Sequence, residues 1–289
     1  MFQKLVRSTV ALILAFAGVT AFAADPSQGL HLQSPRALVM DATTGEVLFD
    51  KNADKVASIA SLTKLLTAMV ILDANLNPYD VLRIAEADLD IIKFTHSGVP
   101  VGAMFTRRTL LRLALMSSDN HATAALARTF KGGNPAFLEA MNRKILALGL
   151  ANTFIEEPTG LSPNNRSNAT DLAQVLLAAS TYPEISDITS QSRALVDVNG
   201  AGQVFRNTNR LVGSPGWNIK LSKTGFIREA GVCVTMMLEE AGRNVIVVLL
   251  GARGGEQRAR DALSIRHWLA RHEPSFATLS AAASEEPLQ

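Results

Sequence analysis

Hydrophobic residues follow two different spacings along this chain, and the spacing changes twice. Near the start, residues 37–41 and 46–50 are short apolar runs joined by the turn-forming residues 41–45, which predicts a β-hairpin. Near the end, apolar runs of strand length occur at residues 217–222, 231–239 and 245–250. We therefore expect strands at both ends of the chain.

Helical spacing dominates the middle of the chain. Residues 58–75 are almost wholly apolar after Lys64, which indicates a helix that is buried on most sides. Further helices are expected at residues 108–116, 121–130, 135–148 and 170–180, and a last one at 256–270. These elements predict an α/β fold: an antiparallel sheet built from both chain ends and flanked by helices, with an all-helical lobe inserted at about residues 80–200.

The first 23 residues are typical of a secretory signal peptide. They have a basic start, an apolar stretch at residues 10–22 and the small-residue cleavage pattern Ala21-Phe22-Ala23. The apolar stretch is short for a membrane span. We expect cleavage to leave a single domain at residues 24–289; an uncleaved N-terminal anchor is the alternative.

The formal net charge of +2 disappears with this segment, because Lys4 and Arg7 supply both units and residues 1–23 contain no acid. A nearly neutral mature chain has no basic stripe for nucleic acid and no polybasic segment for an anionic membrane. Beyond Trp268 the residues are mostly small or polar. We therefore expect an exported, soluble protein with no stable membrane anchor after signal cleavage.

The first candidate chemical motif is Ser61-Leu62-Thr63-Lys64. A serine and a lysine three residues apart share one face of a helix. Serine becomes nucleophilic when a base takes its proton, and lysine can do this only if its pKa falls by several units. Burial in the apolar helix and a second cation, Lys223, would both lower the pKa. In isolation, this spacing would favour an ordinary helix start with a solvated lysine.

The second motif, Ser118-Asp119-Asn120, lies where one predicted helix ends and the next begins. A serine there can pass a proton to a leaving amine, and an asparagine amide can bind a substrate peptide group. The alternative is that Ser118 and Asn120 simply cap the following helix. Ser162-Pro163-Asn164 fits the same pattern, but it lies in a proline-bounded loop.

The third motif is Lys223-Thr224-Gly225, at the end of a predicted strand. Alternate side chains of a strand point to opposite faces, so we expect Thr224 or the backbone to contact substrate while Lys223 reaches a carboxylate or Ser118 from behind. Gly225 would let a substrate backbone approach closely. A strand that ends at a glycine turn is the alternative for this triplet alone.

Other constellations are weaker. None of the five histidines has zinc-ligand spacing or a nucleophile-elbow context, and His121 is expected to pack or cap. Cys233 is the only cysteine, so no internal disulfide is possible, and its apolar neighbours indicate a buried, inert thiol. The three motifs together therefore favour serine acyl transfer without histidine and without a cofactor.

The same motifs in the same order occur in the penicillin-recognising serine enzymes, and this chain resembles them over about residues 35–270. The Thr44-Gly45 hairpin, the Pro158-Thr159-Gly160-Leu161 loop and Asp171-Leu172-Ala173 are more similar to low-molecular-mass D-alanyl-D-alanine peptidases than to β-lactamases. The resemblance implies a β-lactamase/DD-peptidase-like fold. It also implies a periplasmic enzyme that acts on peptidoglycan and is acylated by β-lactam antibiotics.

The resemblance further implies a set of site residues: the catalytic group Ser61, Lys64 and Ser118, and the substrate-binding group Asn120, Lys223, Thr224, Gly225 and Phe226. Ser61 would be acylated with Lys64 as its base. The oxyanion hole would be formed by the backbone N–H groups of Ser61 and Phe226. Arg228 is expected to be a solvated turn residue. The alternative is that it helps to bind a substrate carboxylate.

The chain ends before the C-terminal β-rich domain and the anchor that related carboxypeptidases often carry. In this respect it looks like the endopeptidase branch typified by penicillin-binding protein seven, which cuts D-alanyl–diaminopimelyl cross-links. A D-alanyl-D-alanine carboxypeptidase remains the alternative, and a wall-binding module without turnover is a third. A β-lactamase would need a water-activating carboxylate, whereas Glu156 and Glu157 are expected to be surface loop acids.

Overall fold

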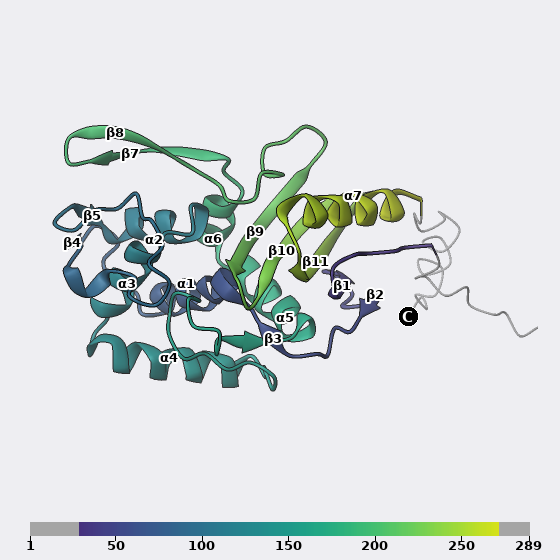
Figure 1. Cartoon of the computed structure of the whole chain (residues 1–289), viewed down its shortest axis with the longest axis horizontal. Helices are drawn as coiled ribbons and strands as arrows, with labels where there is room; N and C mark the ends of the chain where they lie inside the picture. Colours follow the sequence, from purple (N-terminus) through teal and green to yellow (C-terminus); the bar gives the residue numbers. More distant parts are fainter. Residues whose placement is uncertain (1–28, 272–289) are drawn as a thin grey trace, which may run out of the picture.

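Five strands from the two ends of the chain form one antiparallel sheet in the computed structural model, which describes residues 29–271 (Figure 1). They are β1 (Arg36–Asp41), β2 (Val47–Lys51), β9 (Asn218–Ile227), β10 (Gly231–Glu240) and β11 (Arg243–Ala252). The strand order is β2-β1-β11-β10-β9. Pairing of β1 with β11 joins the two chain ends, with Arg36 opposite Leu250. The predicted sheet is confirmed.

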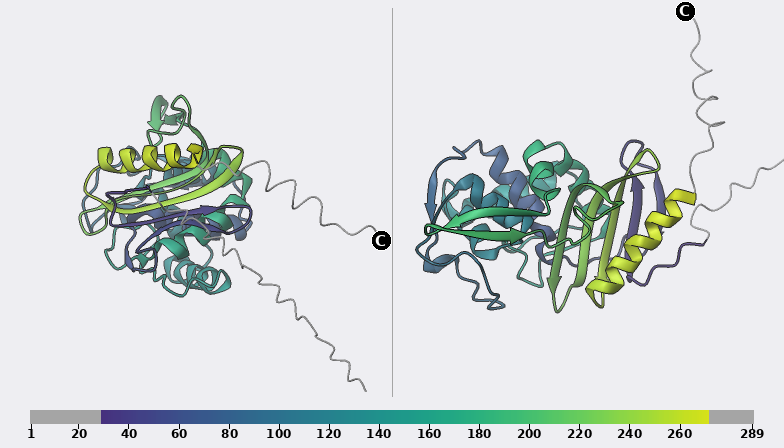
Figure 2. Two further views of the ribbon diagram at one scale, coloured as in Figure 1. Left: turned by 90° about the vertical axis from the view of Figure 1, so that its right-hand side faces the viewer. Right: turned by 90° about the horizontal axis from the view of Figure 1, so that it is seen from above.

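A helix covers each face of this sheet. Helix α7 (Gly255–Arg271) lies across one face, and α5 (Ala169–Ser180) packs against the other (Figure 2). On the α7 side, Trp268 packs among strand residues such as Val247. On the α5 side, Leu176 belongs to the same core as Val248. Burial on both faces explains why β11 is a continuous apolar run and does not alternate.

The helical lobe is built around α1 (Lys64–Asp73). Helices α2 (Arg107–Met116), α3 (Asn120–Arg128) and α4 (Gly133–Ala147) pack against it together with α5, and α6 (Pro183–Thr189) contacts β9. All of α1 from Lys64 to Ile71 is buried. Contact on several sides is the physical reason why this helix has no polar face.

The lobe is not helical throughout, which corrects the sequence expectation. A short pair of strands, β4 (Val81–Arg83) and β5 (Met104–Thr106), flanks the 3₁₀ turn η2 (Glu86–Asp88), and β3 (Ala57–Ser58) pairs with β6 (Arg166–Ser167). The hairpin of β7 (Arg193–Val198) and β8 (Ala201–Arg206) projects alongside α2 (Figure 1). Most side chains of this hairpin are exposed or half-buried.

The two ends of the sequence bear on export and anchoring. The predicted signal peptide at residues 1–23 and the residues after 271 lie outside the described range. Among residues 29–271, no helix combines the length and the hydropathy that crossing a membrane would require.

Candidate active site

Ser61 lies in a tight 3₁₀ turn, η1 (Ala60–Thr63), and not within the long helix that the sequence predicts. The helix α1 begins only at Lys64. Ala60 has a φ of 48° in the left-handed region, so no helix can extend back through it toward Ser58. Residues three apart are nearly eclipsed in a 3₁₀ turn, and Lys64 Nζ lies 3.0 Å from Ser61 Oγ.

Two glycines allow the backbone to close around this turn. A Cβ atom on Gly160 would lie 2.1 Å from the carbonyl oxygen of Ala60, and one on Gly225 would lie 2.8 Å from that of Ile59. Such distances are well below van der Waals contact, so a side chain at either position would force the backbone to shift. Gly225 therefore has a structural role in seating β9 against η1, which differs from the substrate approach expected from the sequence.

Lys64 is 1 % exposed and has three oxygen neighbours. Its Nζ lies 2.7 Å from Asn120 Oδ1, 2.5 Å from the Thr159 carbonyl and 3.0 Å from Ser61 Oγ. The first two oxygens can only accept hydrogen bonds, whereas the serine hydroxyl can also donate. A neutral amine that donates to both acceptors therefore directs its lone pair at the hydroxyl proton of Ser61.

Burial lowers the pKa of Lys64 to about 8, against the opposing effect of Glu157, Asp119 and Asp90. The pKa of Lys223, which is also 1 % exposed, is lowered by burial first and then by the positive charges of Lys64 and Arg258. The expectation of a depressed lysine pKa thus agrees with the structure in direction, and burial is its cause, whereas Lys223, the second cation expected from the sequence, is not among the charges that act on Lys64. A substantial fraction of Lys64 is consequently neutral close to physiological pH.

The second motif forms the corner between α2 and α3. The helix cap is Asp119, whose carboxylate accepts from the backbone N–H of Ala122, so Ser118 and Asn120 are free for other partners. Ser118 has a φ of 59°, a strained conformation for a residue with a side chain. Its hydroxyl accepts a hydrogen bond of 2.9 Å from Lys223 Nζ.

Strand β9 carries the third motif in its interior, because it continues to Ile227 and does not end before Lys223. It is the edge strand, and the Ser222 N–H points away from β10 to Thr189 Oγ1 at 3.3 Å. Backbone groups alternate sides along an antiparallel strand, so the N–H groups of Thr224 and Phe226 face the same open edge. Such an edge can accept an extended peptide as a further strand.

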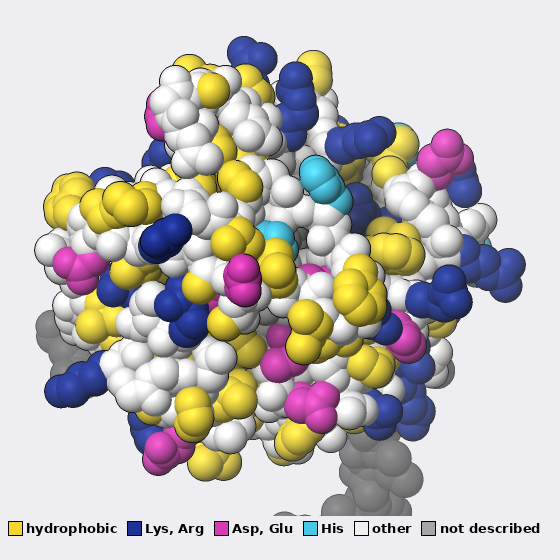
Figure 3. All heavy atoms as spheres, turned by 60° about the vertical axis from the view of Figure 1, so that its left-hand side comes forward, with side chains coloured by type: hydrophobic (Ala, Val, Ile, Leu, Met, Phe, Trp, Pro, Cys, Tyr) yellow, Lys and Arg dark blue, Asp and Glu magenta, His cyan; other side chains and the backbone are white. Residues whose placement is uncertain are grey.

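A groove of about 540 Å³ continues from this edge between residues 92–95 and residues 226–229. Phe226 and Arg228 are exposed in it, and Lys93 pairs with Glu229 at 2.7 Å across it. Hydrophobic and charged side chains are mixed over the face of the molecule that Figure 3 shows. The structure thus brings the three motifs to one site beside a groove.

The loop that contacts Lys64 is held together by Glu157. Its carboxylate accepts from four backbone or side-chain groups of residues 159–162 and from Asn165 Nδ2. Glu156 is exposed and accepts from Ser162 and Asn164. Glu156 is thus a surface acid as expected, whereas Glu157 is half-buried and organises the loop, so its oxygens are already engaged.

His121 and Cys233, the other residues considered in the sequence, are both buried in the protein interior. His121 is buried with Nδ1 2.9 Å from the Val99 carbonyl, as the packing interpretation expects. Cys233 is fully buried, as expected, and burial raises the pKa of its thiol to about 11. Within residues 29–271, no group of three or more histidine, cysteine or acidic side chains is arranged to hold a metal ion.

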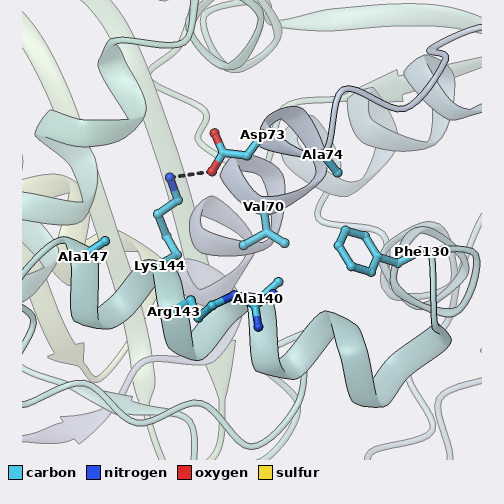
Figure 4. Close-up of a pocket in the computed structure, with 8 residues that line it drawn as sticks. All are labelled: Val70, Asp73, Ala74, Phe130, Ala140, Arg143, Lys144 and Ala147. Carbon is cyan, nitrogen blue, oxygen red and sulfur yellow. Dashed lines mark ion pairs between the residues drawn. The ribbon is translucent and has the colours of Figure 1, made fainter.

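A separate pocket of about 330 Å³ lies at the other end of α1, against α4 (Figure 4). Val70 and Phe130 provide apolar walls, and Asp73 pairs with Lys144 at 2.5 Å. Asp73 is nine residues beyond Lys64, or roughly 14 Å along the helix axis. This pocket has no nucleophile and is distinct from the site around Ser61.

Comparison with known proteins agrees with this geometry. Residues 20–254 match the family model described as D-alanyl-D-alanine carboxypeptidase. A D-alanyl-D-alanine endopeptidase from Pseudomonas aeruginosa is 44% identical over 270 residues, which are 91% of this chain and 87% of that protein. The D-alanyl-D-alanine endopeptidase of Escherichia coli is 38% identical over 252 residues, which are 86% of this chain and 81% of that protein.

The fold agrees as well. The crystal structure of a Streptomyces DD-transpeptidase superimposes with a TM-score of 0.76 at 26% identity, covering 82% of this chain and 97% of that one. The expected DD-peptidase-like architecture is therefore confirmed. From its motifs, its sheet and these matches, the chain belongs to the D-alanyl-D-alanine carboxypeptidase family of serine peptidases.

Proposed function

We propose that this protein hydrolyses D-alanyl peptide bonds of peptidoglycan through an acyl-enzyme on Ser61. One observation carries the proposal: a buried lysine whose pKa is lowered to about 8 lies 3.0 Å from the serine oxygen. Its two other neighbours are hydrogen-bond acceptors, so the neutral amine is oriented as a base.

In the acylation step, Ser61 Oγ attacks the carbonyl carbon of the D-alanyl residue while Lys64 Nζ takes the hydroxyl proton. The C–N bond then breaks, and the amine leaves with a proton delivered through Ser118, which Lys223 polarises at 2.9 Å. Water attacks the resulting ester in the second step. It supplies the hydroxyl of the new carboxyl group and returns a proton to Ser61.

The open edge of β9 supplies the substrate contacts in this proposal. The N–H groups of Phe226 and Ser61 stabilise the oxyanion, a contribution of roughly 3–4 kcal/mol per donor in comparable sites. Asn120 binds the substrate amide. Lys223 and Thr224 bind the terminal carboxylate, and Thr224 Oγ1 is oriented by a 2.6 Å hydrogen bond to Thr208.

Among D-alanyl bonds, we propose the cross-link between two peptide stems as the substrate, which makes the protein an endopeptidase. The two relatives with 44% and 38% identity are both named endopeptidases and match this chain over most of their length. The groove that extends beyond Phe226 offers room for a second peptide strand. Carboxypeptidase activity is the second candidate, because the matching family model has that description.

The compartment follows from the substrate. Peptidoglycan lies outside the inner membrane, so we propose that residues 1–23 direct export to the periplasm and are then removed. We also propose that β-lactam antibiotics acylate Ser61 and inhibit the enzyme, since they present a reactive acyl group to the same nucleophile.

The test is mass spectrometry of a cross-linked muropeptide dimer after incubation with the purified protein, with Ser61→Ala as the control. Conversion to monomers by the wild type alone would support the endopeptidase. Loss of one terminal D-alanine with the cross-link intact would replace it by the carboxypeptidase. If neither a product nor a covalent penicillin adduct formed, the result would favour a wall-binding module without turnover.

A further inference from the structure

The segment between η2 and β5 contains a buried acid that the motifs do not include. Asp90 is 8 % exposed and accepts from the backbone N–H groups of Ile92, Lys93 and Thr95 at 2.8–2.9 Å. Phe94 within this turn has a φ of 53°, a strained conformation that those hydrogen bonds hold in place. Asp90 therefore folds the segment into a fixed turn at the edge of the active site.

The side chain of Thr95 links this turn to the second motif. Its hydroxyl donates to Asp90 Oδ2 at 2.7 Å. A hydroxyl has one hydrogen, so with that hydrogen donated, Thr95 Oγ1 can only accept from its other neighbour, Asn120, at 2.8 Å. The amide of Asn120 must then present its Nδ2 to Thr95 and its Oδ1 to the opposite side.

The opposite side is Lys64, whose Nζ lies 2.7 Å from Asn120 Oδ1. If the amide were reversed, its NH₂ group would face Lys64 and compete for the amine lone pair. The lone pair would then no longer be reserved for the hydroxyl of Ser61. The hydrogen bonds that link Asp90, Thr95, Asn120 and Lys64 therefore each have a fixed donor and acceptor. The Asp90 carboxylate fixes them all, because it can only accept.

We propose that Asp90 and Thr95 are positioning residues: they fix the orientation of the Asn120 amide and thereby direct the lone pair of Lys64 to Ser61. This inference rests on the proposed function, in which Lys64 is the base. It also leaves the second Nδ2 hydrogen of Asn120 for the substrate.

The charge state of Asp90 is consistent with this role. Burial raises the pKa of Asp90, but the hydrogen bonds from Lys93, Thr95 and Ile92 outweigh it, and the pKa is below the usual aspartate value. Asp90 is therefore ionised at neutral pH and is an obligate acceptor.

The segment has other attachments that do not pass through Thr95. Ser97 Oγ donates to Asp119 Oδ2 at 2.6 Å, and the Val99 carbonyl contacts His121 Nδ1 at 2.9 Å. A Thr95→Val substitution should consequently leave the turn attached to α3. The substitution removes the hydrogen-bonding hydroxyl with little change in shape, so it separates positioning from folding.

The test is the second-order rate of acylation by benzylpenicillin, measured at about pH 9.5, where Lys64 is mostly neutral and a change in its pKa has little effect on the rate. We expect Thr95→Val to slow acylation about fivefold and Thr95→Ser to restore it to within about twofold. The amide of Asp90→Asn can donate to Thr95, which would reverse the donor and acceptor of each hydrogen bond from residue 90 to Asn120. This variant should slow acylation at least as much as Thr95→Val.

The matched control is Thr129→Val, which removes a threonine hydroxyl from the same lobe. That hydroxyl donates to the Ala125 carbonyl near the end of α3, away from Lys64. Its acylation rate should equal that of the wild type even if its melting temperature falls. Equal rates for Thr95→Val and wild type, or failure of Thr95→Ser to restore the rate, would overturn the inference. A wild-type protein that forms no acyl-enzyme would instead overturn the proposed function and the inference with it.

Discussion

Neutralising Glu157 should make the enzyme faster at low pH. Burial lowers the pKa of Lys64 to about 8, and of the opposing charges that of Glu157 has the largest effect. Removing this charge by Glu157→Gln should lower the pKa of Lys64 further. More of the lysine is then neutral at a given pH, and the acid limb of the acylation profile moves to lower pH.

The size of the effect follows from the titration of one group. With a pKa of about 8, about one Lys64 in ten is neutral at pH 7. A further fall of about one unit, which corresponds to ~1.4 kcal/mol, would make about half of it neutral. Acylation at pH 7 should then rise up to about fivefold, while the rate at high pH, where Lys64 is neutral in both proteins, stays nearly unchanged.

The assay is the second-order rate of penicillin acylation between pH 5 and pH 10, with Glu156→Gln as the control. Glu156 is the neighbouring exposed acid, and its carboxylate is not among the charges that act on Lys64. Glu157 also organises its loop, so a damaged loop would lower the rate at every pH. Only a lower Lys64 pKa produces a gain confined to low pH. Coinciding acid limbs for the two variants would refute the electrostatic reasoning.

Two further predictions concern packing and stability. Gly225→Ala places a Cβ 2.8 Å from the Ile59 carbonyl, so it should lower the unfolding free energy by about 1–3 kcal/mol and remove most of the acylation rate. Gly254→Ala, which has open space at the Cβ position, is the control and should change neither quantity when melting and penicillin labelling are measured. Between about pH 8 and pH 10, the unfolded state binds more protons at Lys64 than the folded state, so Lys64 contributes a rise of up to ~3 kcal/mol in unfolding free energy with pH. Lys223, whose pKa is also lowered, adds to this rise, and Cys233, whose pKa is raised to about 11, opposes it. In pH-dependent thermal melts, Lys64→Met should therefore lose the Lys64 contribution relative to the wild type.

The sequence predicts the fold wherever hydrophobic spacing reflects burial. The hairpin of β1 and β2, helices α2 to α5 and strands β10 and β11 agree closely with the expected ranges, whereas α6 was not predicted. The hairpin of β7 and β8 was missed although Asn199-Gly200, a typical two-residue hairpin turn with positive φ at both residues, joins its strands; most of its side chains are exposed or half-buried, so hydrophobic spacing does not reveal it. Strand β9 was predicted too short, since the buried polar residues Ser222, Lys223 and Thr224 interrupt its apolar run.

The candidate site was predicted as a set of residues but not as a geometry. Spacing alone placed Ser61 on a helix, because nothing in the sequence marks the left-handed conformation of Ala60. The cap of α3 proved to be Asp119, the one member of the second motif that had no predicted role. Asp90 and Thr95 were missed. An aspartate followed by a short polar segment is a turn signal, but only the folded chain brings Thr95 next to Asn120.

Both lysines of the site are buried without a carboxylate in contact, and this arrangement explains why the pKa of each is lowered. In the described part of the chain, the hydrogen-bond partners of Lys64 and Lys223 are neutral oxygens. The nearby acids are occupied elsewhere: Asp119 accepts from Ala122 and from Ser97, and Glu157 accepts from its own loop. A carboxylate in direct contact would keep Lys64 protonated and abolish the base.

Asn120→Asp tests this argument, because it replaces the oxygen 2.7 Å from Lys64 Nζ by a charged one of the same shape. The new ion pair should raise the pKa of Lys64 by about two units, which slows acylation at pH 7 by about 100-fold and moves the acid limb to about pH 10. Asn120→Ala removes the same amide without adding charge, so its rate should fall at all pH values with the limb in place. A limb near pH 8 in Asn120→Asp would mean that Lys64 is not the group whose deprotonation controls acylation.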